Sequence, residues 1–296
     1  MKRIFSHLVL LGLLMLSTQA FATIKVVTTV PDFGSIAKAV GGDLLSITTL
    51  VKPTQDPHFV DAKPSLLLAL NQADLLLTAG MELEAGWLPP LISGARNSDI
   101  LKGGNGYLEC GTLIEPMEVR KVNRAEGDIH PGGNPHFWID PRNGVAIAKG
   151  IASKLAAIDP DNKAAYTTGL EKFLASLKTA MSKWQQQLAP LKGTSVVVYH
   201  ESWVYFLDWA GLKQVGSLEP KPGIPPTPSH VATLIRQVST NNVKFMMQES
   251  FYPTSLSKLF ASKSGATLKI LPTMTGARGT RTYIELIEYI VEELIK

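Results

Sequence analysis

The chain has 296 residues, of which 45% are hydrophobic and 18% are charged, with 29 Lys and Arg against 25 Asp and Glu. This composition is typical of a folded protein with a sizeable core and excludes fibrous, disordered and multi-span membrane classes. The nearly balanced charge, with no cluster of Lys and Arg, argues against nucleic acid as a partner. A single cysteine, Cys110, excludes an internal disulfide and a zinc site built of thiolates.

Residues 1–22 have the pattern of a secretory signal peptide. Lys2 and Arg3 form a positive start, 8–16 is apolar, and A-F-A at 20–22 is a cleavage site. The apolar run of roughly ten residues is too short to span a bilayer. No cysteine lies near the cleavage site to carry a lipid anchor. The sequence therefore predicts a periplasmic protein.

In the N-terminal half, apolar β-branched runs that predict strands alternate with helix-like stretches. The predicted strands are 24–30, 47–51 and 75–78, and the predicted helices are 33–40, 65–72 and 143–157. A loop-rich region occupies 101–142. Such alternation predicts parallel βα units and therefore an α/β layered sheet.

The segment 160–188 predicts one long helix, because apolar residues recur in it at spacings of three and four. Asp159 is placed to cap its start, with Pro160 at the first helical position. Some 29 helical residues span about 44 Å, which is more than a connection between two strands needs. We interpret this helix as a rigid connection between two lobes; the alternative is a long surface helix.

The alternation resumes after the long helix. The predicted strands are 195–199, 243–247 and 268–271, and the predicted helices are 202–210, 229–239, 253–262 and 280–294, with a Pro-rich loop at 219–228. The predicted organisation is therefore a signal peptide at 1–22, an N-terminal α/β lobe at 23–142, a connecting helical region at 143–190 and a C-terminal α/β lobe at 191–296.

Three histidines lie where a cleft between such lobes is expected. His58 lies in D-P-H at 56–58, His136 in N-P-H-F-W-I-D-P at 134–141, and His200 directly follows a predicted strand. Ligands of open α/β sheets bind at the carboxyl ends of strands, and imidazole is the commonest protein ligand of zinc. Each histidine alone is better explained by capping or packing, so the prediction rests on their joint placement. Glu249 is expected at the same sheet end as His200 and is the predicted fourth ligand.

The leader, the two motifs, the histidine after a strand and the long helix together resemble the zinc/manganese-binding proteins of bacterial ABC importers. The resemblance covers the whole mature chain. It implies two α/β lobes joined by a rigid helix, with a metal ion bound between them by His58, His136 and His200. In manganese-preferring relatives a carboxylate replaces the third histidine, so His200 favours Zn²⁺ over Mn²⁺.

The sequence differs from this family in two places. Many relatives have an aspartate ligand after the last strand, whereas 271–274 contains no carboxylate, so the fourth ligand is either Glu249 or a water. Zinc-selective relatives often carry a long His-rich loop before the second motif, but 122–134 holds only Glu126, Asp128 and His130. His130 is either a weak capture ligand or a solvated loop residue.

Other polar residues have less specific interpretations. Asp56 and Asp140 flank two of the histidines and are placed to orient them, although Asp140 is equally placed to cap the helix that follows it. His230, at a predicted helix start, is interpreted as structural. The aromatic residues around His200 are interpreted as core packing.

The leading hypothesis is a periplasmic receptor of an ABC importer, and not an enzyme. It captures Zn²⁺, or less favourably Mn²⁺, between its lobes and delivers the ion to an inner-membrane permease; we expect a monomer. The alternative is an exported zinc hydrolase that uses the same histidines with Glu249 as the base, although the H-E-x-x-H and G-x-S-x-G signatures are absent. A third hypothesis is a binding protein for a metal chelate or another small organic ligand.

Overall fold

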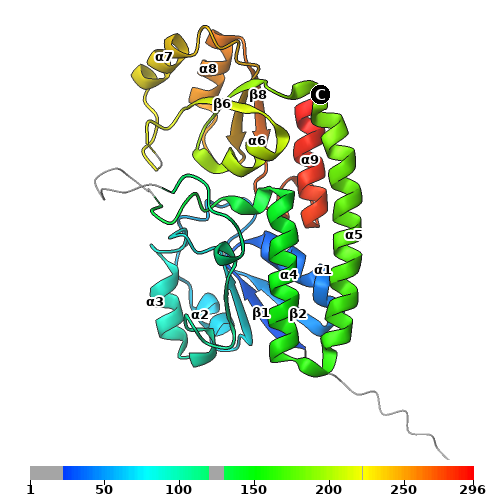
Figure 1. The fold of residues 1–296 in the computed structure, drawn as a ribbon. Helices are drawn as coiled ribbons and strands as arrows, with labels where there is room; N and C mark the ends of the chain where they lie inside the picture. The colour runs from blue at the N-terminus through cyan, green and yellow to red at the C-terminus, as the bar shows by residue number, and fades with distance from the viewer. Residues whose placement is uncertain (1–22, 120–129, 222) are drawn as a thin grey trace, which may run out of the picture.

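The computed structural model describes residues 23–119, 130–221 and 223–296. The predicted signal peptide, Glu126 and Asp128 lie outside these residues. The described chain forms two α/β lobes that lie along one long helix, α5 (Lys163–Leu188) (Figure 1). The predicted fold class is therefore confirmed. None of the described helices is both long enough and apolar enough to span a bilayer.

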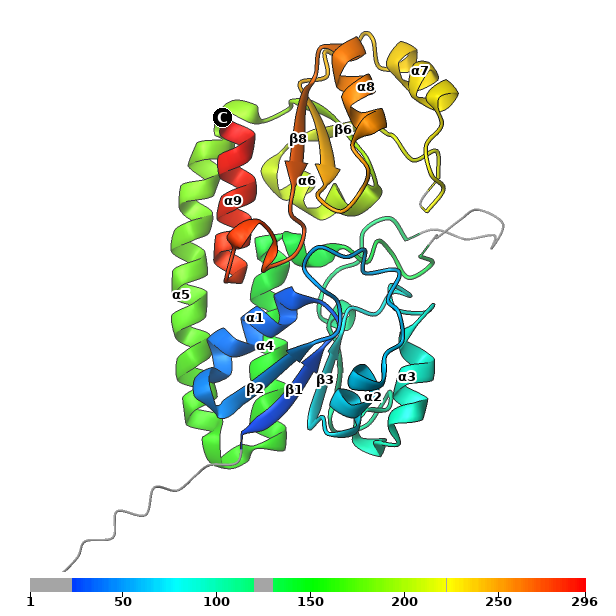
Figure 2. The ribbon, with the colours of Figure 1, turned by 180° about the vertical axis from the view of Figure 1, so that it is seen from behind.

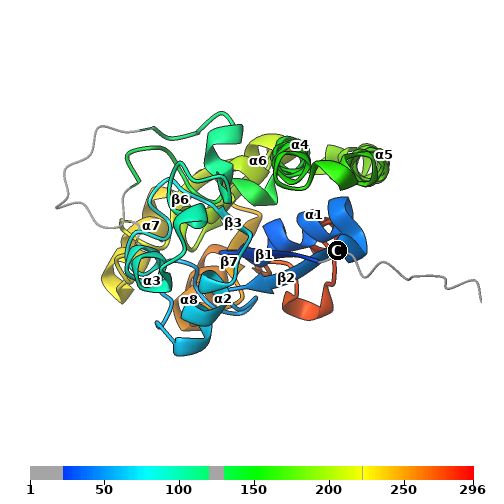
Figure 3. The ribbon, with the colours of Figure 1, turned by 90° about the horizontal axis from the view of Figure 1, so that it is seen from below.

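The first lobe is built on a fully parallel sheet. Its strands are β1 (Ile24–Thr28), β2 (Leu45–Thr49), β3 (Leu75–Thr78) and β4 (Tyr107–Glu109), in the order β2-β1-β3-β4. The helices are α1 (Pro31–Gly41), α2 (Pro64–Asn71), α3 (Leu88–Ala95) and α4 (Pro141–Ile158). The sheet lies between α1, α4 and α5 on one side and α2 and α3 on the other (Figures 1 and 3). Because both faces are covered, all four residues of β3 are buried.

The second lobe repeats this arrangement. Its strands are β5 (Ser195–Val198), β6 (Lys213–Ser217), β7 (Phe245–Glu249) and β8 (Thr267–Leu271), in the parallel order β6-β5-β7-β8. The helices are α6 (Val204–Ala210), α7 (Pro228–Gln237) and α8 (Ser255–Ser264). Val196 and Val198 join the large core of the molecule, whereas Val197 joins a smaller core with α7 and α8. Alternate residues of one strand thus hold helices on opposite faces of the sheet.

The long helix is present as predicted, but it starts differently. Residues 160–162 form a 3₁₀ turn, and α5 itself begins at Lys163. Asp159 is at the N-cap position of this turn and Pro160 is its first residue, as predicted. The Asp159 carboxylate makes no capping bond to a backbone N–H; it accepts from the hydroxyl of Tyr166 at 2.5 Å and from Asn162 Nδ2 at 2.9 Å. Helix α5 runs beside both lobes and contacts α1, α4 and α9 (Tyr283–Ile295) (Figures 1 and 2).

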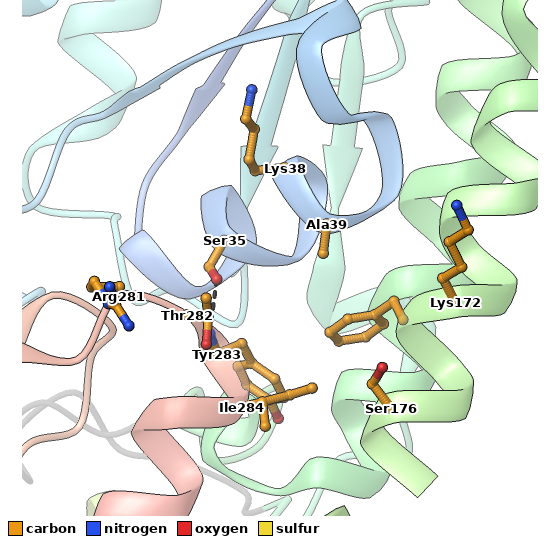
Figure 4. Close-up of a pocket in the computed structure, with 10 residues that line it drawn as sticks. Ser35, Lys38, Ala39, Lys172, Ser176, Arg281, Thr282, Tyr283 and Ile284 are labelled. Atoms are coloured by element: carbon orange, nitrogen blue, oxygen red, sulfur yellow. Dashed lines mark hydrogen bonds between the residues drawn. The ribbon is translucent and has the colours of Figure 1, made fainter. Parts of the chain in front are cut away.

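After β8 the chain returns toward the first lobe. Asp32 Oδ1 in α1 accepts hydrogen bonds from the backbone N (3.2 Å) and Oγ1 (2.9 Å) of Thr275. The backbone N of Tyr283 donates to Ser35 Oγ at 2.8 Å, which fixes the start of α9 against α1 beside a cavity of about 380 Å³ (Figure 4). The C-terminal helix therefore packs on α1 and α5. The division of the chain into four regions stays a prediction.

One helix and two strands were not predicted from the sequence: α3, β4 and β6. A further difference, in the bounds of β7, affects the site. The strand expected at 243–247 spans 245–249. Glu249 is therefore the last residue of β7, instead of following the strand as predicted.

Replacing Gly169 tests the contact between α5 and α1. A Cβ at this position would lie 1.9 Å from the carbonyl oxygen of Val40, so the two helices can approach only with glycine there. We expect Gly169→Ala to lower the free energy of unfolding by about 1–3 kcal/mol in urea denaturation. The exposed Thr179→Ala on the same helix should change it by no more than about 0.5 kcal/mol. Equal effects of the two substitutions would contradict the close approach.

Candidate metal centre

The two sheets direct their carboxyl ends toward each other. In each sheet the strand order reverses direction between its two central strands, β1 and β3 in one and β5 and β7 in the other. The strands of each lobe run toward the other lobe (Figure 2). Ligands of doubly wound sheets bind outside the carboxyl ends at this reversal point. His200 lies two residues after the end of β5 and Glu249 ends β7, so the second lobe presents both at the expected place.

The three predicted histidines converge between the lobes. His58, His136 and His200 are buried, and each offers a ring nitrogen within 4.8 Å of those of the other two. The Nε2 atoms of His136 and His200 are 3.1 Å apart. Two bonds of about 2.0–2.1 Å to one tetrahedral zinc would place their nitrogens about 3.4 Å apart. The described residues therefore contain a cluster of three imidazoles close enough together to be candidate ligands of a single cation.

His58 is held by the turn that follows β2. Asp56 Oδ1 accepts hydrogen bonds from the backbone N of His58 at 3.0 Å and from its ring Nδ1 at 2.8 Å. Trp87 fixes the same turn by donating from Nε1 to the carbonyl of Pro57 at 3.0 Å. The other ring nitrogen of His58, Nε2, is buried without a hydrogen-bond partner. Asp56 thus orients His58 as predicted and leaves Nε2 free to bind a ligand.

His136 is positioned by a comparable local contact. Its backbone N donates to Asn134 Oδ1 at 3.0 Å at the start of the 3₁₀ turn 137–139. Asn134 Nδ2 donates at 2.7 Å to the carbonyl of Glu201, which neighbours His200 in the second lobe. Asn134 therefore ties the loop that carries His136 to the turn that carries His200.

His200 has a partner that the sequence analysis missed. Glu219 Oε2 lies 2.6 Å from His200 Nδ1 and also accepts the backbone N–H of Gly223 at 3.1 Å. The backbone N of Glu219 donates to the carbonyl of Tyr199 at 3.0 Å, which places Glu219 beside the end of β5. The only signal in the sequence is a glutamate that opens the Pro-rich loop.

The predicted fourth ligand, Glu249, is buried beside this cluster. Both of its carboxylate oxygens are buried, and neither has a hydrogen-bond partner that meets ordinary geometric criteria. The set of mutually close ligand atoms in the described chain contains the three imidazoles without Glu249. Its role as a ligand stays a prediction.

His130 is not a solvated loop residue, so that interpretation is wrong. Its ring lies 5.5 Å from that of His58, centroid to centroid, and both of its ring nitrogens are buried without a hydrogen-bond partner. Burial, together with the charges of His58 and His200, lowers the pKa of His130 to about 4. The imidazole is therefore neutral at physiological pH and lies at the edge of the cluster.

Two other predicted residues have structural roles. Asp140 caps α4 through the backbone N of Arg142 at 2.8 Å and pairs with its guanidinium, so it does not orient His136. His230 lies in the first turn of α7, with Nε2 3.3 Å from the carbonyl of Ser217. Asp140 is therefore the helix cap that the sequence offered as one alternative, and His230 is structural as interpreted.

The pKa shifts at the cluster follow from burial and paired charge. Burial lowers the pKa of His136 well below its ordinary value. Burial also lowers the pKa of His200, but the hydrogen bond and charge of Glu219 outweigh it, so the pKa is raised overall. Burial raises the pKa of Glu249 to about 7 against the opposing charge of His200. For Asp56, the hydrogen bond and charge of His58 outweigh burial and lower the pKa.

Comparison with known proteins places this geometry in a family context. Residues 26–296 match the profile of the family described as zinc-uptake complex component A, periplasmic. The manganese ABC transporter substrate-binding lipoprotein PsaA of Streptococcus pneumoniae is 29% identical over 236 residues, which are 77% of this chain and 72% of that protein. The high-affinity zinc uptake system protein ZnuA of Paracoccus denitrificans is 27% identical over 220 residues, or 64% of each chain.

Solved structures have the same fold. A crystal structure of ZnuA superposes with a TM-score of 0.76 at 25% identity and covers 92% of this chain and 98% of that one. The Mn-bound periplasmic metal-binding protein from candidatus liberibacter asiaticus has a TM-score of 0.76 at 21% identity, over 91% of this chain and 97% of that one. The second similarity supports the fold alone.

Cation binding at the cluster should depend on pH, because a proton competes for the same nitrogens. The pKa of His200 is raised and that of Glu249 is about 7. We therefore expect the affinity for Zn²⁺ to fall by on the order of tenfold or more between pH 7.5 and 5.5, measured by competition with a fluorescent chelator. Glu219→Gln removes the charge that raises the pKa of His200, so the fall should move to lower pH. An affinity that is constant over this range would contradict the assignment.

Proposed function

Because the chain belongs to the family of the periplasmic zinc-uptake complex component A, we propose that it captures Zn²⁺ between its lobes for an ABC importer. It is a metal-binding substrate-binding protein, and its relatives are receptors rather than enzymes. Zinc is the transported cargo.

The observation that carries the proposal is the convergence of three buried imidazoles from two lobes. We propose that His58 and His136 of the first lobe and His200 of the second bind the ion through nitrogen. Asp56 and Glu219 accept from the opposite ring nitrogen of His58 and His200, which fixes the tautomer that leaves the binding nitrogen free. Neither carboxylate needs to bind the ion itself in order to strengthen the site.

Zinc is favoured over manganese by the chemistry of these donors. Imidazole nitrogen suits Zn²⁺, whereas Mn²⁺ favours carboxylate and other oxygen ligands. The similar proteins include both a manganese-binding lipoprotein and a zinc-uptake protein, so the choice for this chain rests on its own residues. The chain has His200 where the resemblance expects a carboxylate in manganese-binding relatives. We therefore propose Zn²⁺ as the physiological cargo and Mn²⁺ as a weaker ligand.

Glu249 is proposed as the fourth donor. Three neutral imidazoles bring no negative charge into contact with zinc, and a charge buried without such contact is costly. The carboxyl group of Glu249 is fully buried within reach of the charge of His200, and its pKa is raised to about 7. The charge of an arriving cation therefore favours loss of its proton. The alternative fourth donor is a water.

We further propose that the mature protein works as a monomer in the periplasm and passes zinc to an inner-membrane permease. The support for the periplasm and the permease is the family of periplasmic uptake components, together with the signal-peptide pattern at 1–22. Release then requires that the lobes separate the first two histidines from His200.

Metal titration of single-histidine variants tests this proposal. The metal-free mature chain should bind one Zn²⁺ more tightly than Mn²⁺ in competition with a fluorescent chelator. His58→Ala, His136→Ala and His200→Ala should each weaken zinc binding by more than about 100-fold, since each removes a direct ligand.

His230→Ala is the matched control, because this partly buried histidine lies outside the cluster and should leave zinc binding unchanged. Tighter binding of Mn²⁺ would refute the choice of metal. Unchanged zinc affinity in any of the three cluster variants would refute that residue as a ligand.

A further inference from the structure

One hydrogen bond joins the two lobes at the edge of the histidine cluster. The hydroxyl of Tyr252 donates to Asp56 Oδ2 at 3.1 Å, across 196 positions of sequence. Tyr252 lies in the turn that follows β7, whereas Asp56 lies in the turn that follows β2. The bond therefore exists only while these two turns, one from each lobe, are close together.

The carboxylate of Asp56 has a distinct partner for each oxygen. Oδ1 accepts from the backbone N and ring Nδ1 of His58, and Oδ2 accepts from Tyr252. A carboxylate bonded through both oxygens cannot turn without breaking a bond. Tyr252 thus fixes the group that fixes the ring of His58.

Tyr252 is itself held firmly in the second lobe. Its ring stacks on Tyr199, with centroids 4.4 Å apart and planes 17° apart, and Tyr199 directly precedes His200. Its carbonyl accepts from Gln248 Nε2 at 2.8 Å. Gln248 is in turn bonded to Ser257 of α8. A movement of the second lobe therefore carries the Tyr252 hydroxyl with it.

We propose that Tyr252 is a positioning residue that couples closure of the lobes to the orientation of His58. In the closed form its hydroxyl locks Asp56, and Asp56 holds the ring of His58 with Nε2 toward the cluster. When the lobes part, the hydroxyl leaves, Asp56 can turn, and His58 loses its fixed orientation. Opening therefore loosens a ligand of the first lobe in addition to withdrawing His200. This inference rests on the proposed function, because it concerns the release of the captured ion.

Asn134 has the corresponding place on the other side of the cluster. It accepts from the backbone N of His136 and donates to the carbonyl of Glu201 in the second lobe. His58 and His136 are thus each held by a polar residue of the first lobe, Asp56 and Asn134, that is also hydrogen-bonded to the second lobe. The two residues differ in what they bond. The side chain of Asn134 bonds backbone groups of both loops, whereas the hydroxyl of Tyr252 bonds only the side chain of Asp56, so it can be removed without disturbing the backbone.

The release rate of zinc from Tyr252→Phe tests the proposal. This variant removes one hydroxyl and keeps the ring that stacks on Tyr199. In stopped-flow experiments with zinc-loaded protein and excess chelator, we expect about tenfold faster release. This is the low end of the effect of losing the partner of a ligand, because Tyr252 acts on that partner, Asp56. The rate of zinc uptake should stay within about twofold, since the hydroxyl of Tyr252 is already away from Asp56 in the open form that meets the ion. Unchanged release would overturn the proposal.

Tyr107→Phe is the matched control. It also removes a partly buried hydroxyl, which lies 3.2 Å from Thr78 Oγ1 and 3.4 Å from Glu109 within the first lobe. Release from this variant should match the unsubstituted protein. An equal acceleration in both variants would overturn the proposal, because the effect would then be a general one of lost hydroxyls.

A double-mutant cycle separates coupling through Asp56 from a general structural effect. In the Asp56→Ala background, Tyr252→Phe should produce no further acceleration, because its acceptor is gone. A full additional effect there would overturn the coupling.

The starting protein distinguishes this proposal from the proposed function. If the unsubstituted chain does not bind zinc, the proposed function fails and the inference fails with it. If it binds zinc and Tyr252→Phe releases the ion at the same rate, only the inference fails.

Discussion

A divalent cation leaves water only for a site whose donors replace its hydration shell, and here the donors come from two lobes. The fold meets this constraint with two similar α/β lobes. Both sheets have the same strand order, and their carboxyl ends face each other, so loops from each lobe reach the same buried region. Helix α5 lies along both lobes, and the chain after β8 returns to α1. The position of three imidazoles therefore depends on how the lobes are held together.

Two of the three imidazoles have a carboxylate behind them. Asp56 and Glu219 contact the ring nitrogens of His58 and His200 that point away from the cluster, and Glu249 is buried at the end of β7. Burial keeps His136 neutral in the empty site, and Glu219 offsets the charge of His200 when that ring is protonated. The same carboxylates offset part of the charge of a bound ion. This arrangement suits a receptor that must bind its cargo and later release it.

The pattern of apolar residues in the sequence predicted those helices and strands whose own residues carry a clear signal. The strand 75–78 is found as expected, because a fully buried parallel strand is a continuous apolar run. Strand β6 was missed, because K-Q-V-G-S at 213–217 has no such run, and β4 has only three residues. The three histidines were found from motifs and their resemblance to a family. Glu219 and Tyr252 were missed because their importance lies in contacts with residues 19 and 196 positions away.

The central claim is that three imidazoles bind one zinc ion between the lobes. X-ray absorption spectroscopy on the zinc-loaded mature protein tests it most directly, since the zinc edge reports the donors around the metal itself. The account predicts a four-coordinate ion with three imidazole nitrogens and one oxygen, all at about 2.0–2.2 Å. Fewer than three imidazoles around the zinc, or a shell made mainly of oxygen, would contradict it.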